Sequence, residues 1–262
     1  MKYFASAFWA EALKARRSKI PFFTALGLSI APLVGGLFMI ILKDPEAAKS
    51  MGLISAKAQL TAGTADWSAF FNMQAQAVAI GGMIVFAIIT AWVFGREFSD
   101  HTAKELLALP TARETILAAK FLLIALWTFA LIVFIFIFGL IVGNLVDIPG
   151  WSMELLQSSV VNIFGAGILT IALLPYVAWF ASAGRGYMPA FGWAVLTVVL
   201  AQIAAATGWG DWFPWSVPAL FSEVAGPRGE LLGAHSYILV PLACVIGLYG
   251  TFYWWRNADH TR

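Results

Sequence analysis

The chain has 262 residues and a formal net charge of +2, and 61% of its residues are apolar while only 11% are charged. A typical soluble domain is about 45–50% apolar and about 25% charged, so the composition excludes a soluble globular enzyme and a disordered chain. The small net charge excludes a nucleic-acid binder, which would carry a strongly basic surface. An integral membrane protein is the class that remains.

Six apolar segments are long enough to cross a membrane as helices, which takes about 20 residues each. None of the six contains Asp, Glu, Lys or Arg. The predicted fold class is therefore all-α: a polytopic domain with six transmembrane helices over residues 20–262, preceded by a separate segment, residues 1–19. The predicted spans are residues 20–42, 77–95, 121–146, 160–183, 187–207 and 237–255.

The segment before the first span is predicted to form an amphipathic helix in the plane of the lipid headgroups. Its apolar and charged residues separate on a helical wheel, and its basic residues would face anionic lipid. The alternative is a simple topology anchor of positive charge. No signal cleavage site follows the first span, which we expect to be retained. The interfacial residues are Phe4, Phe8, Trp9, Leu13, Lys14 and Arg17, with Glu11 on the charged half.

Lys and Arg residues predict the orientation of the spans, because cytoplasmic loops carry an excess of them. With the N-terminus inside, twelve of the 16 basic residues lie on the inner side and four on the outer side. Both termini are therefore expected in the cytoplasm, and the protein in a prokaryotic cytoplasmic (inner) membrane.

The loop between the second and third spans contains two capping boxes, Thr102 with Glu105 and Thr111 with Glu114. The first box predicts a short helix that Pro110 ends, and the second predicts the start of the helix that enters the third span. Such a rigid short helix can transmit movement from a soluble partner to two spans. The alternative is a simple interfacial connector.

The loop resembles the cytoplasmic loop of ABC type-2 exporter permeases, in which it forms the coupling helix that sits in a groove of the ATPase. His101 replaces the Gly that usually precedes the threonine. A second segment, residues 213–218, is similar to one in the bacitracin and lantibiotic self-protection group of these permeases. The matching loop residues are Glu97, Thr102, Leu106, Leu107, Pro110 and Arg113, and the charged residues Asp100, Lys104 and Glu105 lie among them.

The resemblance implies a non-catalytic permease subunit of an ATP-driven exporter for an amphiphilic or hydrophobic substrate such as a drug, an antimicrobial peptide or a lipid-like molecule. It implies two ATPase subunits that carry the ATP and Mg, docked on residues 97–113, and a homodimer or heterodimer of permeases in contact with membrane lipid. The chain itself is expected to bind no cofactor, no metal and no nucleic acid. Its substrate residues stay unknown.

Residues 208–236 lie between the last two spans and are rich in Trp and Pro. The family resemblance implies a re-entrant segment here, whereas the composition alone also fits an aromatic belt at the membrane surface. Asp211, Glu223 and Glu230 are either contacts for a cationic substrate or solvated loop charges.

Small residues recur every four positions in the first and last spans, a spacing that allows close approach of helices either within the bundle or in a dimer. They are Gly27, Ala31 and Gly35, and Ala243, Gly247 and Thr251.

The predicted spans carry no ionisable acid or base of the kind that proton- and ion-coupled transporters place along their pathway. The chain also lacks a G-x-x-x-x-G-K-[ST] phosphate loop, so the energy is expected to come from a separate ATPase. Neither an H-E-x-x-H nor a G-x-S-x-G motif is present, which argues against an enzyme. The alternatives left open are an ion-coupled secondary transporter and a non-transporting membrane assembly or scaffold protein.

Overall fold

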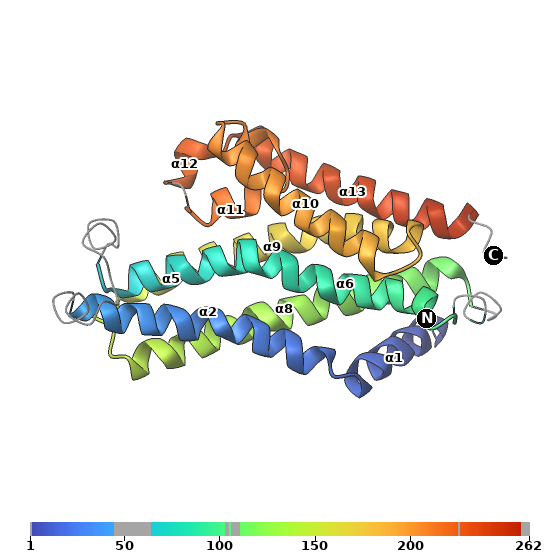
Figure 1. The fold of residues 1–262 in the computed structure, drawn as a ribbon, viewed down its shortest axis with the longest axis horizontal. Coiled ribbons are helices and arrows are strands. Elements are labelled where there is room, and N and C mark those ends of the chain that lie inside the picture. The colour runs from blue at the N-terminus through green and yellow to red at the C-terminus, as the bar shows by residue number, and fades with distance from the viewer. Residues whose placement is uncertain (1, 45–63, 103–104, 106–110, 225, 258–262) are drawn as a thin grey trace.

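The computed structural model describes residues 2–44, 64–102, 105, 111–224 and 226–257. These residues form helices and no strands, which confirms the all-α prediction (Figure 1). Six helices are long and apolar enough to cross a membrane, as predicted. They are α2 (Ile20–Lys43), the continuous run Trp67–Ser99, α8 (Arg113–Leu145), α9 (Met153–Ala183), α10 (Tyr187–Ala206) and α13 (Ala234–Asn257).

The run Trp67–Ser99 consists of α5 (Trp67–Gln76), a π-helical turn η1 (Ala77–Gly81) and α6 (Gly82–Ser99). Helix α1 (Lys2–Arg17) precedes α2 at an angle, and three short helices separate α10 from α13 (Figure 1). These are η2 (Gly210–Trp212), α11 (Val217–Phe221) and α12 (Arg228–Leu231).

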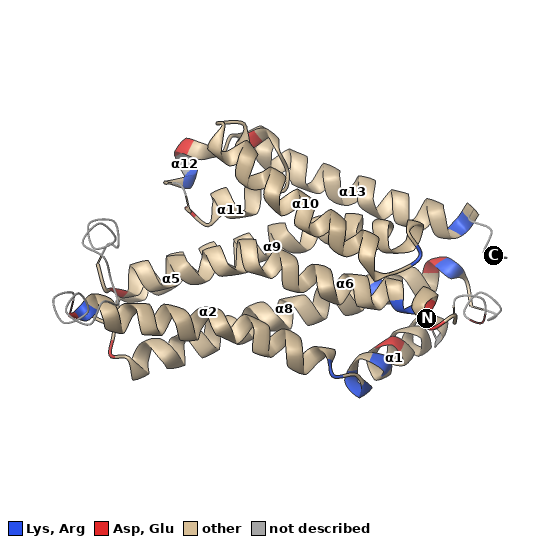
Figure 2. Cartoon of the chain, in the orientation of Figure 1, with Lys and Arg blue, Asp and Glu red and all other residues tan. Residues whose placement is uncertain are grey.

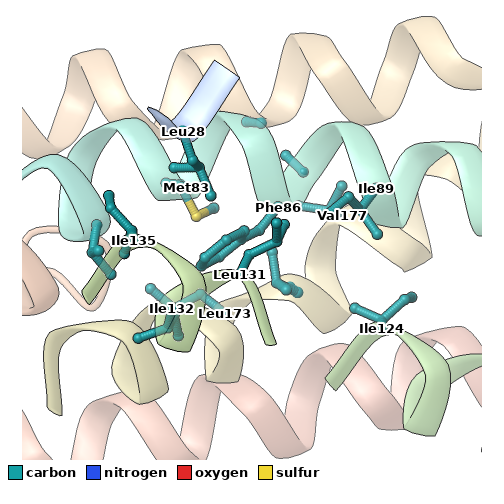
Figure 3. Close-up of a cluster of buried hydrophobic side chains, with 14 of the residues drawn as sticks. Leu28, Met83, Phe86, Ile89, Ile124, Leu131, Ile132, Ile135, Leu173 and Val177 are labelled. Carbon is teal, nitrogen blue, oxygen red and sulfur yellow. The ribbon is translucent and has the colours of Figure 1, made fainter. Parts of the chain in front are cut away.

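Helix α9 is the centre of the bundle, because it packs against α5, α6, α8, α10, α11 and α13. Helix α2 packs instead against α8 and α5. The interior is filled by aliphatic and aromatic side chains from these helices. Phe86 of α6 is fully buried in the middle of this core, surrounded by Met83, Leu131 and Leu173 (Figure 3).

The second span begins ten residues earlier than the predicted residue 77, because Asp66 caps it. The Asp66 carboxylate accepts a hydrogen bond from the Ala69 amide at 2.8 Å. The added turns carry polar residues, a composition typical of a loop, but Gln74 is buried and Asn72 and Gln76 are half-buried in the structure. Asn162 of α9 donates to Asn72 at 3.4 Å.

Helix α8 has 33 residues and is about 50 Å long at 1.5 Å per residue, which exceeds the hydrocarbon thickness of about 30 Å. Its first turns therefore extend beyond the apolar layer. The predicted cap at Thr111 is wrong, because the N-cap is Ala112 and no side chain caps this end. The φ of Ala112 is −56° and its ψ is 134°, so the chain enters the helix from extended backbone without needing a polar cap.

The segment between α10 and α13 folds back onto the bundle. Helix α11 packs against α9. The Phe221 ring lies against Gly165 of α9, in the space that a side chain at position 165 would fill. The Asp211 carboxylate lies 3.0 Å from His235 Nε2, and Glu223 pairs with Arg228 at 3.1 Å. Two of the three predicted loop acids therefore form pairs within the segment, and its depth in the membrane stays a prediction.

The small residues of the last span serve packing within the chain. A Cβ at Gly247 would lie 2.8 Å from the Tyr176 nitrogen and 2.9 Å from the Pro175 carbonyl carbon, so the glycine allows α13 to touch the backbone of α9. Thr251 Oγ1 adds a hydrogen bond to the Pro175 carbonyl at 3.2 Å. In the first span, the Phe70 ring packs against Gly35, whereas Gly27 has open space beside it.

Candidate functional site: a buried ion cluster beside the predicted coupling loop

Helix α1 and the C-terminal end of α13 lie at the same end of the bundle, which we call the N/C end (Figure 1). Glu97 lies there, in the last turn of α6, with only 3% of its surface exposed. Its Oε1 accepts hydrogen bonds from Lys14 Nζ of α1 at 2.8 Å and from Lys120 Nζ of α8 at 2.9 Å. Its Oε2 accepts one from Thr102 Oγ1 at 2.7 Å. One carboxylate thus joins three helices and the segment that follows α6.

Lys120 is fully buried. Its ammonium donates to Glu11 Oε2 at 3.0 Å, to Glu97 Oε1 at 2.9 Å and to the Val93 carbonyl at 2.9 Å. A lysine has three N–H donors, and here each one has an acceptor. In the sequence, Lys120 directly precedes the predicted third span, residues 121–146, and the structure encloses it between α1, α6 and α8.

Glu11, Lys14, Glu97 and Lys120 together form what we call the ion cluster. Glu11 is 5% exposed and bridges both lysines, since Lys14 Nζ also donates to its Oε1 at 2.9 Å. Burial lowers the pKa of Lys14, but the Glu11 and Glu97 carboxylates outweigh this effect and raise the pKa above its usual value. Two carboxylates balance two ammonium groups, and such a buried set is stable only while complete, because removal of one partner leaves a buried charge uncompensated.

The ion cluster fixes α1 against the bundle. Ala15 is buried beside it, and Phe8 and Ala12 pack against the core. The helical wheel placed Glu11 and Lys14 on the charged half with Arg17, yet the structure turns these two inward and leaves Arg17 exposed. Of the other predicted interfacial residues, Trp9 is exposed, and Phe4, Phe8 and Leu13 are half-buried.

The loop that follows α6 is tied to the bundle at both of its ends. At its start, Thr102 donates to Glu97. At its end, Arg113 Nη1 donates to the carbonyls of Trp255 at 3.0 Å and Arg256 at 3.4 Å, and so satisfies acceptors near the C-terminal end of α13. The predicted coupling residues Lys104, Leu106, Leu107 and Pro110 lie outside the described residues, as does nearly all of the predicted short helix.

The remaining predicted coupling residues are at the surface. Asp100 is exposed and accepts a hydrogen bond from Arg96 Nε at 2.8 Å, and Glu105 is exposed as well. His101 has a φ of 58°, in the left-handed region that favours glycine. ABC type-2 permeases usually have Gly at this position. In this chain the residue is His, but its backbone has the conformation that favours Gly.

Sequence reasoning did not identify Glu11 and Lys120 as site residues. Glu11 is 109 positions from Lys120 in the chain, and no local pattern joins residues so far apart. One signal was available: Lys120 stands between Ile116–Leu117–Ala118–Ala119 and the apolar run from Phe121, and a charge within apolar sequence needs a partner.

A family model described as "ABC-2 family transporter protein" matches residues 7–202, a stretch that contains the whole ion cluster. The bacitracin transport permease protein BCRB of Bacillus licheniformis is 24% identical over 183 residues, which cover 70% of this chain and 87% of that protein. No solved structure matches the chain. With six helices able to span a membrane and a family model that covers most of its length, the chain belongs to the ABC-2 family of transporters, as a multi-pass membrane permease.

Proposed function

We propose that the chain is the membrane subunit of an ATP-driven exporter that moves an amphiphilic or hydrophobic substrate out of the cytoplasm. The observation that carries the proposal is the attachment of the loop after α6 at both ends, through Thr102 to Glu97 and through Arg113 to α13. In a chain of the ABC-2 family, such a loop is suited to receive movement from a separate ATPase.

The charge distribution supports a cytoplasmic N/C end. Most Lys and Arg of the described residues lie at that end, and only Lys43 and Arg228 lie at the opposite end (Figure 2). An excess of basic residues marks the cytoplasmic side of a membrane protein. The loop would then face the compartment that holds ATP.

Movement of the loop would reach four helices. Its start is bonded to Glu97, which the ion cluster connects to α1, α6 and α8, and its end is bonded to α13. Because every member of the cluster is paired, and all but the half-buried Lys14 are buried, these helices would shift as one body. Glu97 would thus act by positioning the helices, since a residue 3% exposed offers almost no surface to a partner.

Two ATPase subunits, with ATP and Mg, would dock on residues 97–113 of two permease copies or of this chain and a related one. Their closure on ATP would draw the loops together and change the shape of the pathway between the permeases. The described ends of the loop supply polar groups for docking, with Asp100 and Glu105 both exposed.

An amphiphilic or hydrophobic substrate is supported by an apolar groove of about 460 Å³ between α2 and the second span. Its lining includes Gly27, Ala31 and Phe38 of α2 and Val85 of α6, with no ionisable side chain. A relative named as a bacitracin transport permease extends the candidates to antimicrobial peptides.

The test is reconstitution of the purified permease with an ABC ATPase that co-purifies with it, in vesicles that contain or lack ATP. ATP hydrolysis stimulated by substrate, and export that requires ATP, would support the proposal. Replacement of both Leu106 and Leu107 with Ala should detach the ATPase and leave the permease in the membrane, whereas Glu114→Gln, an exposed change beyond the loop, should not.

Export driven by an ion gradient without ATP would instead establish an ion-coupled transporter. Absence of any ATPase partner after gentle solubilisation would favour an assembly or scaffold protein.

A further inference from the structure

A pocket of about 570 Å³ opens at the N/C end between α1, α6 and the start of α10. It adjoins the ion cluster, with which it shares only Lys14. Its lining includes three cationic side chains and one anionic one, for a net charge of +2, together with two aromatic rings. They are Lys14, Arg17, Arg96, Asp100, Trp92 and Tyr187.

The Lys14 ammonium is balanced by the carboxylates of the ion cluster, so the positive charge open to a ligand comes from the two arginines. Arg17 is exposed and has no ion-pair partner among the residues that the structure describes. Arg96 donates its Nε to Asp100 at 2.8 Å, and this hydrogen bond does not use the two terminal nitrogens of the guanidinium. Arg17 and Arg96 line the same pocket, and the planar fork of N–H donors on an arginine suits a phosphate group.

The aromatic residues indicate the depth of the pocket. Trp and Tyr concentrate at the level of the lipid headgroups, and Trp92 additionally lies 5.2 Å below the Arg96 guanidinium. A ligand that reaches this pocket from the bilayer would therefore arrive with its headgroup at the right height.

An apolar surface continues from the pocket toward the middle of the membrane. Arg96, Trp92 and Val85 are spaced so that they share one face of α6. The distance from Arg96 to Val85 is about 16 Å at 1.5 Å per residue, which is about half of the hydrocarbon thickness. Val85 lines the apolar groove along α2, where Gly27 leaves open space.

The geometry points to a binding site for an anionic phospholipid of the leaflet at the N/C end. Arg17 and Arg96 hold the phosphate, Trp92 and Tyr187 enclose the glycerol region, and one acyl chain follows α6 into the groove beside α2. This site needs neither ATP nor the ATPase, so it stands independently of the proposed function.

The test is native mass spectrometry of the purified permease in a nonionic detergent, titrated with phosphatidylglycerol or phosphatidylcholine. We expect one saturable phosphatidylglycerol site per chain, with phosphatidylcholine bound at least about tenfold more weakly. The double variant Arg17→Gln, Arg96→Gln should lower the affinity for phosphatidylglycerol by about tenfold or more. Both residues are partly or fully exposed, so their loss should leave the fold intact.

The matched control is the double variant Arg16→Gln, Lys19→Gln, which removes the same charge from neighbouring exposed positions outside the pocket. Its affinity should stay within about twofold of the original. Equal losses in both double variants, or no loss in the pocket variant, would overturn the site. Displacement of the lipid by inorganic phosphate at the same concentration would overturn the assignment to a lipid.

Discussion

The ammonium of Lys120 lies 2.9 Å from Oε1 of Glu97, and the two side chains are 0% and 4% exposed. This contact joins the start of α8 to the end of α6 and completes the ion cluster. An ion pair so deeply buried is weak evidence of net stability, but its disruption is costly, because the remaining charges have no water to solvate them.

The first prediction concerns this contact. Lys120→Met keeps the length of the side chain but leaves Glu11 and Glu97 to share Lys14 alone. We expect it to destabilise the purified protein by about 3–5 kcal/mol, measured by thermal unfolding in detergent. Lys19→Met removes an exposed lysine and should change stability by less than about 0.5 kcal/mol. Equal melting curves for both variants would show that the cluster does not support the fold.

The second prediction is that Glu11 holds α1 against the bundle. In Glu11→Gln, Lys14 and Lys120 lose a carboxylate each, and α1 should separate more often from α8. Trypsin should then cleave after Arg16 or Arg17 about tenfold faster or more, as measured by the rate at which the chain that begins at Arg17 or Ser18 forms. Glu114→Gln, which alters an exposed acid in the first turn of α8, serves as the control and should leave the rate unchanged.

The third prediction separates coupling from assembly, and it rests on the proposed function. Thr102→Val removes the hydroxyl that donates to Glu97, a hydrogen bond to a charged group worth about 1.5–3 kcal/mol. Substrate-stimulated ATP hydrolysis should fall by about tenfold, with normal amounts of permease in the membrane. Thr102→Ser keeps the hydroxyl and should retain activity. If Thr102→Val is as active as Thr102→Ser, the loop is not coupled through Glu97.

The fourth prediction concerns the backbone at His101. Because its φ of 58° costs an L-residue energy that glycine avoids, His101→Gly should stabilise the purified permease by about 1 kcal/mol. A rise in the thermal midpoint measures it. A lower midpoint would mean that the imidazole makes contacts whose loss outweighs the relief.

The fifth prediction tests the contact between α13 and α9. Gly247→Ala places a Cβ 2.8–2.9 Å from the backbone of Pro175 and Tyr176, and should destabilise the protein by about 1–3 kcal/mol. Gly192→Ala meets nothing within 4 Å and should be neutral or slightly stabilising, because alanine favours the helix. The thermal midpoint should therefore fall for Gly247→Ala, and stay the same or rise slightly for Gly192→Ala.

The number and order of the spans could be predicted from the sequence because hydropathy alone determines them. Hydropathy fails where polar residues face the protein interior. Asn72 and Asn162 face each other across α5 and α9, and the start of the second span was predicted ten residues too late. The capping box at Thr111 failed for a different reason, since helix α8 begins at Arg113, which is held by α13 through a tertiary contact.

The pairing within the ion cluster could not be predicted from the sequence, because its contacts join residues 83 and 109 positions apart. The helical wheel grouped Glu11 with Lys14 correctly but placed that face outward. A wheel shows which residues share a face and leaves open which partner the face meets. Here the partner is Lys120, whose burial becomes visible only when α1, α6 and α8 are packed together.

The chain order of the ion cluster has a consequence for biosynthesis. Glu11, Lys14 and Glu97 are all translated before Lys120, so a nascent chain that ends just after the second span holds two carboxylates and a single lysine of the cluster. Lys120 brings the balancing charge when the third span enters the membrane. Insertion of that span therefore marks the moment at which the early part of the protein can fold, and chains arrested before it are expected to be targets for membrane proteases.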